Sequence, residues 1–160
     1  MENRLNQSVQ DQIARVFVFI DRAIEGANHE LWHGIDPKEK GIWQHCAHMI
    51  EVLDFYLCDN LVDSYEWNAL FGIDWEDFGN KSAPGQIQMK AYSSETKEKI
   101  LGYLNQKADE DFLGEEKQAK WTGATPLDKA IYAVRHTTHH IGEINQIFRR
   151  HDLPVIEQDR

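Results

Sequence analysis

Apolar side chains recur at intervals of three and four residues in four separate parts of the chain. These parts cover about residues 9–24, 42–61, 93–114 and 125–151. Such spacing places the apolar side chains on one side of an α-helix, and no segment shows the alternation typical of a half-buried strand. Four long amphipathic helices in a chain of 160 residues predict an all-α fold, a four-helix bundle, in a single domain spanning residues 1–160.

Capping signals mark the ends of these helices with different clarity. Thr125 and Pro126 combine an N-cap residue with proline at the first helical position, so they predict where the last helix begins. The first helix is expected to stop at Gly26. The second helix has two candidate starts, because residues 36–39, Asp-Pro-Lys-Glu, have the pattern of a cap, whereas Gly41 can mark a later start.

The connection between the second and third helices, residues 62–91, is too long for a hairpin turn and suits a crossover connection. It contains five aromatic residues among acidic ones: Tyr65, Trp67, Phe71, Trp75 and Phe78. We expect these rings to cap the end of the bundle or to meet a second subunit; the alternative is that they form a pocket wall over a site in the bundle. Exposed aromatic rings in this connection favour self-association as a homodimer.

The charge balance restricts the partners of the chain. A formal net charge of −10 and a pI near 5.2 argue against nucleic-acid binding, which needs clustered Lys and Arg. No apolar run approaches 18 residues and the N-terminus has no apolar signal core, so we expect a cytoplasmic protein without a membrane segment. On one helix, Cys46 and Cys58 are about 18 Å apart along the axis, which is too far for a disulfide.

Three of the eight histidines fall within residues 136–140, in the last predicted helix. Residues four apart share a face one turn apart, so His136 and His140 can direct their imidazoles at one point. Both lie within or at the edge of the apolar stripe, whereas His139 is rotated toward solvent. Two buried polar rings each need a partner, which is either a chelated divalent metal or a set of polar neighbours.

A metal site in the core of a helical bundle takes its ligands from more than one helix. The second predicted helix offers two candidates, His45 and His48, in the stretch Trp43 to Glu51. Counting about 100° of rotation per residue directs both imidazoles toward the core. Helical periodicity alone therefore leaves the choice between the two open.

A competing metal motif occurs at residues 29–33, His-Glu-Leu-Trp-His, which match the H-E-x-x-H signature of zinc proteases. That chemistry requires both histidines on one rigid helix. Gly26 and Gly34 leave barely one turn between them, which is too little helix to hold such a chelate. We interpret the segment as a loop or short helical turn that packs Leu31 and Trp32.

In two segments the chain resembles the DinB-like (DinB/YfiT) family of four-helix-bundle metalloproteins. Residues 136–143, His-Thr-Thr-His-His-Ile-Gly-Glu, are similar to the family's H-x-x-H-H-R-G-Q, and Leu153-Pro154 follows the helix end as it does in the family. Residues 42–48 resemble the opening of the family's second helix, in which one histidine lies a turn and a half inside. With the helix order and the long second connection, the resemblance covers most of the chain.

This resemblance implies a metal triad of His48, His136 and His140, and it selects His48 over His45. It also implies a divalent metal, commonly zinc or nickel, and frequent homodimers. Characterised members of the family include enzymes that transfer low-molecular-weight thiols to electrophiles. A thiol is therefore implied as a second small molecule at the site.

Two residues depart from the family motif, since Ile141 stands in place of its Arg and Glu143 in place of its Gln. Roles that depend on the family's Arg and Gln side chains therefore do not carry over to this chain. Glu143 lies near the His136 side of the helix, where it is a candidate outer acceptor or catalytic base. The alternative for Glu143 is a solvated position on the helix surface.

Three neutral imidazoles leave a divalent ion its full charge and an open coordination position, at which a bound water or thiol has a lowered pKa. The residues alone thus favour a Lewis-acidic site. The resemblance adds the expectation of a metal-dependent thiol S-transferase that acts on electrophilic or xenobiotic small molecules. A metal-dependent hydrolase with the same triad and a non-catalytic metal-binding stress protein are the alternatives.

Overall fold

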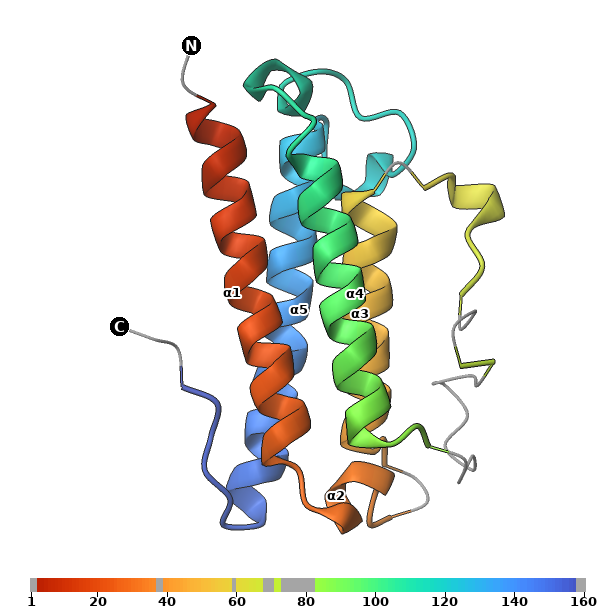
Figure 1. Ribbon diagram of the computed structural model, residues 1–160, viewed down its shortest axis with the longest axis vertical. Coiled ribbons are helices and arrows are strands. Elements are labelled where there is room, and N and C mark those ends of the chain that lie inside the picture. The colour runs from red at the N-terminus through yellow and green to blue at the C-terminus, as the bar shows by residue number, and fades with distance from the viewer. Residues whose placement is uncertain (1–2, 37–38, 59, 68–70, 73–82, 158–160) are drawn as a thin grey trace.

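All the regular structure in the described part of the chain is helical. The structure is a computed structural model, and it describes residues 3–36, 39–58, 60–67, 71–72 and 83–157. Four long helices lie side by side (Figure 1): α1 (Arg4–Gly26), α3 (Ile42–Leu57), α4 (Gln86–Leu104) and α5 (Pro126–Arg150). A fifth, short helix, α2 (His29–His33), lies between α1 and α3 along the chain.

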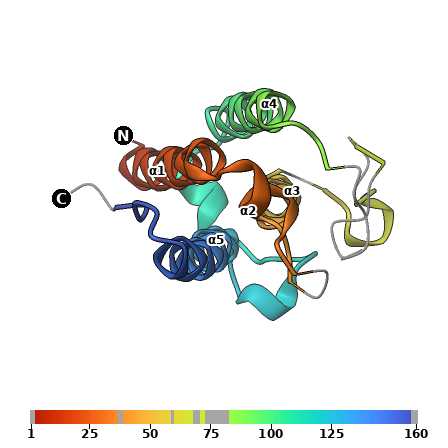
Figure 2. The same ribbon diagram turned by 90° about the horizontal axis from the view of Figure 1, so that it is seen from below.

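Each long helix packs against at least two long neighbours, and α1 and α3 also contact each other. α3 contacts α4 and α5, and α1 contacts the same two helices, as the end view in Figure 2 shows. α3 and α4 run in the same direction, whereas α1 and α5 run opposite to them (Figure 1), so the segment between α3 and α4 leads from one end of the helices to the other. The largest fully buried side chains come from all four: Phe17, Ile20, Trp43, Met49, Ile100 and Phe148. None of the described helices combines the length and hydropathy that a membrane-spanning helix needs.

The first and last long helices end and begin where the sequence predicts. α1 stops at Gly26, and α5 starts at Pro126. The Thr125 hydroxyl accepts a hydrogen bond from the Asp128 backbone N–H at 3.2 Å, and the Asp128 carboxylate accepts one from the Thr125 N–H at 2.9 Å. These reciprocal bonds satisfy backbone donors that the first turn leaves without a helical partner, which fixes the start of α5.

Of the two candidate starts for the second long helix, Gly41 is the N-cap. α3 begins at Ile42, and the Gly41 backbone N–H donates to the Gln44 side-chain oxygen at 2.8 Å. Within the alternative cap at residues 36–39, Pro37 and Lys38 lie outside the described residues. α3 ends at Leu57, four residues before the predicted position 61, since the backbone is extended at Cys58.

The third long helix differs most from its prediction. α4 begins at Gln86, well before the predicted start at Ser93 or Ser94, and ends at Leu104. Its first turns are mostly exposed, with Met89 buried, so they lack the apolar spacing on which the prediction depended. The chain beyond Leu104 forms the separate 3₁₀ helix η2 (Asp109–Phe112) instead of continuing α4 toward Gly114.

The connection between the second and third long helices is accordingly shifted, to residues 58–85 in place of 62–91. It contains the short 3₁₀ helix η1 (Val62–Ser64). Two of its five aromatic residues, Trp75 and Phe78, lie outside the described residues. The predictions made for those two rings therefore stay predictions.

Gly41 is needed because α2 and α3 approach closely there. A Cβ atom at this position would overlap the Trp32 carbonyl oxygen and lie 2.9 Å from the Gly34 nitrogen, both of them backbone atoms that cannot rotate away. We expect Gly41→Ala to destabilise the protein by about 1–3 kcal/mol, as overpacking does. Urea unfolding followed by circular dichroism measures the change.

Gly102→Ala is the matched control for this prediction. A Cβ atom at Gly102 in α4 meets nothing within 4 Å. Alanine should therefore stabilise α4 by up to about 1 kcal/mol through its higher helix propensity. A Gly41→Ala variant as stable as the parent would contradict the close approach of α2 and α3.

Candidate metal centre

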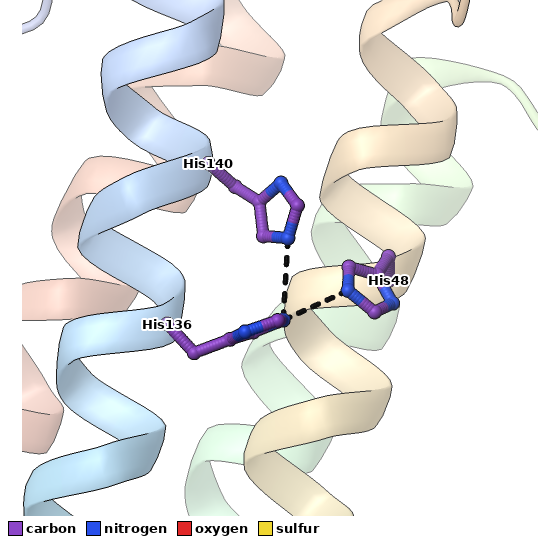
Figure 3. A group of neighbouring side chains, drawn as sticks. All are labelled: His48, His136 and His140. Carbon is purple, nitrogen blue, oxygen red and sulfur yellow. Dashed lines mark hydrogen bonds between the residues drawn. The ribbon is translucent and has the colours of Figure 1, made fainter.

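The contact between α3 and α5 brings three histidines together. His48 comes from α3, and His136 and His140 come from successive turns of α5, so that the rings converge (Figure 3). His136 Nε2 lies 2.9 Å from His48 Nε2 and 3.2 Å from His140 Nε2. One ligand atom from each of the three residues lies within 4.8 Å of the other two. The structure therefore assembles the three residues that the resemblance implies.

The spacing of these nitrogens fits a small divalent cation. Ligand bonds of 2.0–2.1 Å at tetrahedral angles place two imidazole nitrogens about 3.3 Å apart. The separations of 2.9 Å and 3.2 Å from His136 Nε2 are close to that value. Converging ring nitrogens that each carry a lone pair also repel one another unless a proton or a cation lies between them. The donor set is thus suited to holding a metal ion.

Glu143 orients one of the three rings. His140 Nδ1 lies 2.6 Å from Glu143 Oε2. An ionised carboxylate only accepts hydrogen bonds, so Nδ1 carries the ring proton and Nε2 keeps its lone pair, directed at His136. A carboxylate behind a histidine in this way sets the tautomer that a metal ligand needs. Burial alone would raise the pKa of the Glu143 carboxyl, but the hydrogen bond from His140 and the nearby histidines lower that pKa on balance.

Glu143 also lies close to two further histidines. His45 Nδ1 is 3.6 Å from Glu143 Oε2, and His139 Nε2 is 3.4 Å from Glu143 Oε1. The side chain of His139 is 69% exposed, in agreement with its predicted direction. His45, Glu143 and His140 form a second group with ligand atoms within 4.8 Å of one another, but there the short hydrogen bond between Glu143 and His140 already uses one carboxylate oxygen. The three-histidine group is the stronger candidate.

The rings at this site are neutral at neutral pH. Burial, reinforced by the neighbouring histidines, lowers the pKa of His48 to about 3 and that of His136 to about 4. Burial also lowers the pKa of His140, against the opposing effect of Glu143, and it lowers the pKa of His45 to about 4. Metal ligation requires unprotonated imidazoles, and in their neutral form all three rings of the triad meet this requirement.

The H-E-x-x-H segment does not form a comparable site. His29 and His33 are exposed, and His33 Nδ1 donates to the His29 carbonyl oxygen at 2.8 Å. Among the described residues, neither histidine belongs to a group of three ligands that can hold a metal. Leu31 and Trp32 are buried, as predicted for a short helical turn. The geometry thus gives no support to a zinc-protease site.

Neither cysteine takes part in the site. Cys46 and Cys58 are both buried and form no disulfide with each other, as the sequence predicts from their separation. Burial raises the pKa of the Cys46 thiol, so this side chain stays protonated at neutral pH. A protonated, enclosed thiol is a poor nucleophile and a poor metal ligand.

The described aromatic residues of the long connection pack away from the triad. The rings of Tyr65 and Trp67 each lie 5.1 Å from the Phe55 ring, and the Phe71 ring lies 5.3 Å from that of Tyr92 in α4. These three rings thus cover the side of α3 and α4, whereas the histidines converge between α3 and α5. These contacts give no support to the alternative in which Tyr65, Trp67 and Phe71 form a pocket wall over the metal.

A different aromatic residue lies next to the triad. The Tyr132 ring is one helical turn before His136, at 5.9 Å from the His136 ring and tilted by only 15°. Sequence reasoning missed it, although the four-residue spacing between Tyr132 and His136 was available as a signal. Its neighbour Tyr56 comes from α3, and Tyr56 in turn contacts Trp121, which lies in a segment that the helical periodicity does not cover.

These features define an all-helical protein with a candidate three-histidine metal centre between two adjacent helices. No protein-family model, no curated protein and no solved structure matches the chain. The resemblance to DinB-like proteins therefore depends on the motif residues themselves. The evidence for a metal site is the arrangement of the three histidines in this structure.

Proposed function

We propose that this chain is a DinB-like protein that binds one divalent metal, zinc or nickel, through His48, His136 and His140 and transfers a low-molecular-weight thiol to electrophilic or xenobiotic small molecules. The observation that carries the proposal is the convergence of three ring nitrogens on one point. The hydrogen bond that turns the N–H of His140 toward Glu143 also supports metal binding, because it leaves the lone pair of Nε2 for the metal. The thiol chemistry comes from the motif resemblance.

A four-helix bundle is part of the same proposal. It is supported by the four long helices, each packed on at least two others, and by the shared direction of α3 and α4. In such a bundle, ligands from facing helices project inward and form the metal site. We further propose that the functional unit is a homodimer, on the basis of the resemblance and the exposed Trp67 of the long connection.

The side chains of the centre have separate roles in this proposal. The neutral rings of His48 and His136 offer lone pairs directly, while Glu143 holds His140 in the tautomer that offers the third. A divalent cation held by three neutral ligands keeps its charge and lowers the pKa of a thiol at its remaining position. In the overall reaction the thiol loses its proton to solvent, its sulfur forms a bond to the electrophilic carbon, and the leaving group departs with the bonding electrons.

The proposal predicts turnover that needs both a metal and a thiol. The untagged protein, loaded with zinc or nickel, is assayed with iodoacetamide and cysteine by following the loss of free thiol above the uncatalysed rate. Omitting the metal should abolish the enzymatic rate. His29→Ala, which changes an exposed histidine outside the triad, is the matched control and should retain the rate.

Other outcomes would replace this function with another. Hydrolysis of ester or phosphate substrates by the metal-loaded protein without a thiol would favour a metallohydrolase. Metal binding with neither activity would favour a non-catalytic metal-binding protein. Failure to bind zinc or nickel at all would overturn the proposal.

A further inference from the structure

A row of aromatic rings continues from the triad at the contact between α3 and α5. The row consists of Tyr132, Tyr56 and Trp121, and it starts beside His136. From the Tyr132 ring, the Tyr56 ring lies at 5.1 Å, and the Trp121 ring lies 6.5 Å beyond that. Successive rings are inclined by 64° and 71°. Tyr56 is buried, whereas Tyr132 is half-buried and Trp121 is exposed, so the first and last rings of the row are accessible to a further planar group.

Trp121 is held in place although 57% of it is exposed. Its indole N–H donates to the Tyr56 hydroxyl at 3.0 Å, and it belongs to the 3₁₀ helix η3 (Lys120–Thr122). An exposed indole that only needs solvation does not require a hydrogen bond to a second helix. The contact instead orients the ring along the row.

The loop that carries Trp121 is anchored by a buried carboxylate. Glu116 Oε1 accepts hydrogen bonds from the backbone N–H groups of Gln118 and Ala119 at 2.8 Å and 2.9 Å. Glu116 Oε2 forms an ion pair with Lys129 of α5 at 2.8 Å, and both side chains are largely buried. A buried, fully partnered carboxylate fixes the backbone just before Trp121. The row is therefore preorganised, which lowers the entropic cost of binding a ligand.

Arg135 adds a positive charge to one side of the row. Its guanidinium carbon lies 5.5 Å from the centre of the Tyr132 ring. An electron-poor ring that carries nitro or carboxylate groups would gain from both the electron-rich Tyr132 ring and this charge. Such rings are also among the electrophiles that thiols attack.

We propose that Tyr132 and Trp121, held in place by the buried Tyr56 between them, form the binding surface for a planar, electron-poor aromatic electrophile, with the reactive carbon directed at the triad. Tyr132 lies one turn from His136, so a ring that packs on Tyr132 lies beside the place where the thiol would be held. The assignment of the bound aromatic ligand as an electrophile rests on the proposed thiol transfer. The binding of a planar aromatic ligand to this surface does not depend on thiol transfer.

Binding is tested with 1,3-dinitrobenzene, a planar electron-poor ring without a leaving group, by equilibrium dialysis against the purified protein. We expect Trp121→Ala to weaken binding about tenfold, the equivalent of one lost aromatic stacking contact. Trp121→Phe should restore most of the affinity, because it keeps an aromatic face. No measurable binding to the parent protein, or equal binding to Trp121→Ala, would overturn the proposal.

Trp67→Ala is the matched control, because Trp67 is another part-exposed tryptophan, packed on Phe55 outside the row. It should bind 1,3-dinitrobenzene as the parent protein does. A loss equal to that of Trp121→Ala would show that the probe binds exposed tryptophans generally and would overturn the assignment. Thermal unfolding of each variant verifies that it is folded.

Kinetics separate this inference from the proposed function. With cysteine as the thiol, Trp121→Ala should lower kcat/KM for 1-chloro-2,4-dinitrobenzene about tenfold and leave kcat/KM for iodoacetamide, which has no ring, within about twofold. In this reaction sulfur bonds to the ring carbon and chloride leaves with the bonding pair. Equal losses for both electrophiles would overturn the role of the row. If neither electrophile is turned over, the thiol transfer fails, and the dialysis result alone decides whether the row binds aromatic rings.

Discussion

Purified His136→Ala protein is expected to contain less than about a tenth of the metal that the parent protein binds, which we expect to be about one ion per chain. His136 is the central ring of the triad, because its Nε2 is within 3.2 Å of the corresponding atoms of both other rings. Its removal leaves His48 and His140 as two ligands on different helices, without the third nitrogen that closes the site. Inductively coupled plasma mass spectrometry of the untagged protein measures the occupancy.

Three further variants make this result specific. His48→Ala should empty the site as His136→Ala does, because it removes the only ligand from α3. His29→Ala and His45→Ala should keep the metal, since neither residue belongs to the triad. Full occupancy in His136→Ala, or loss in His29→Ala, would contradict the ligand assignment.

Glu143→Ala is expected to weaken metal binding about 10- to 100-fold while leaving the three ligands in place. The variant removes the acceptor of the 2.6 Å hydrogen bond from His140 Nδ1, so the ring is free to rotate and to place its proton on Nε2. Competition with a chromophoric chelator measures the affinity for zinc.

Glu143→Gln is the control for this prediction, because the amide oxygen still accepts a hydrogen bond from Nδ1 without carrying a charge. It also places glutamine where the resembled family has it. We expect Glu143→Gln to retain most of the affinity that Glu143→Ala loses. An unchanged affinity in Glu143→Ala would show that the carboxylate does not orient His140.

Local sequence signals predicted a helix boundary correctly where a capping pattern and the apolar spacing indicate the same position. The start of α5 follows from Thr125 and Pro126, because the reciprocal hydrogen bonds with Asp128 are encoded within four residues. The start of α4 could not be predicted in the same way. Its first turns are mostly exposed, with Ile87 88% exposed, so they carry no apolar stripe to recognise.

The candidate site was predictable only in the part that one helix determines. The spacing of His136 and His140 is a local property of α5, and so is their inward direction. Whether His45 or His48 completes the group depends on the register between α3 and α5, which is set by long-range packing. Periodicity directs both rings toward the core, and the motif resemblance made the choice. The hydrogen bond of Glu143 depends on side-chain rotamers, which helical angles do not describe.

The two helices that supply the triad are far apart along the chain, since His48 and His136 are separated by 88 positions. An unfolded chain therefore holds these imidazoles at random distances and presents a poor chelate. A cation that binds only the folded chain shifts the unfolding equilibrium by about 2.7 kcal/mol when its free concentration is 100 times its dissociation constant. The ion would thus act as a reversible cross-link between α3, in the first half of the chain, and α5.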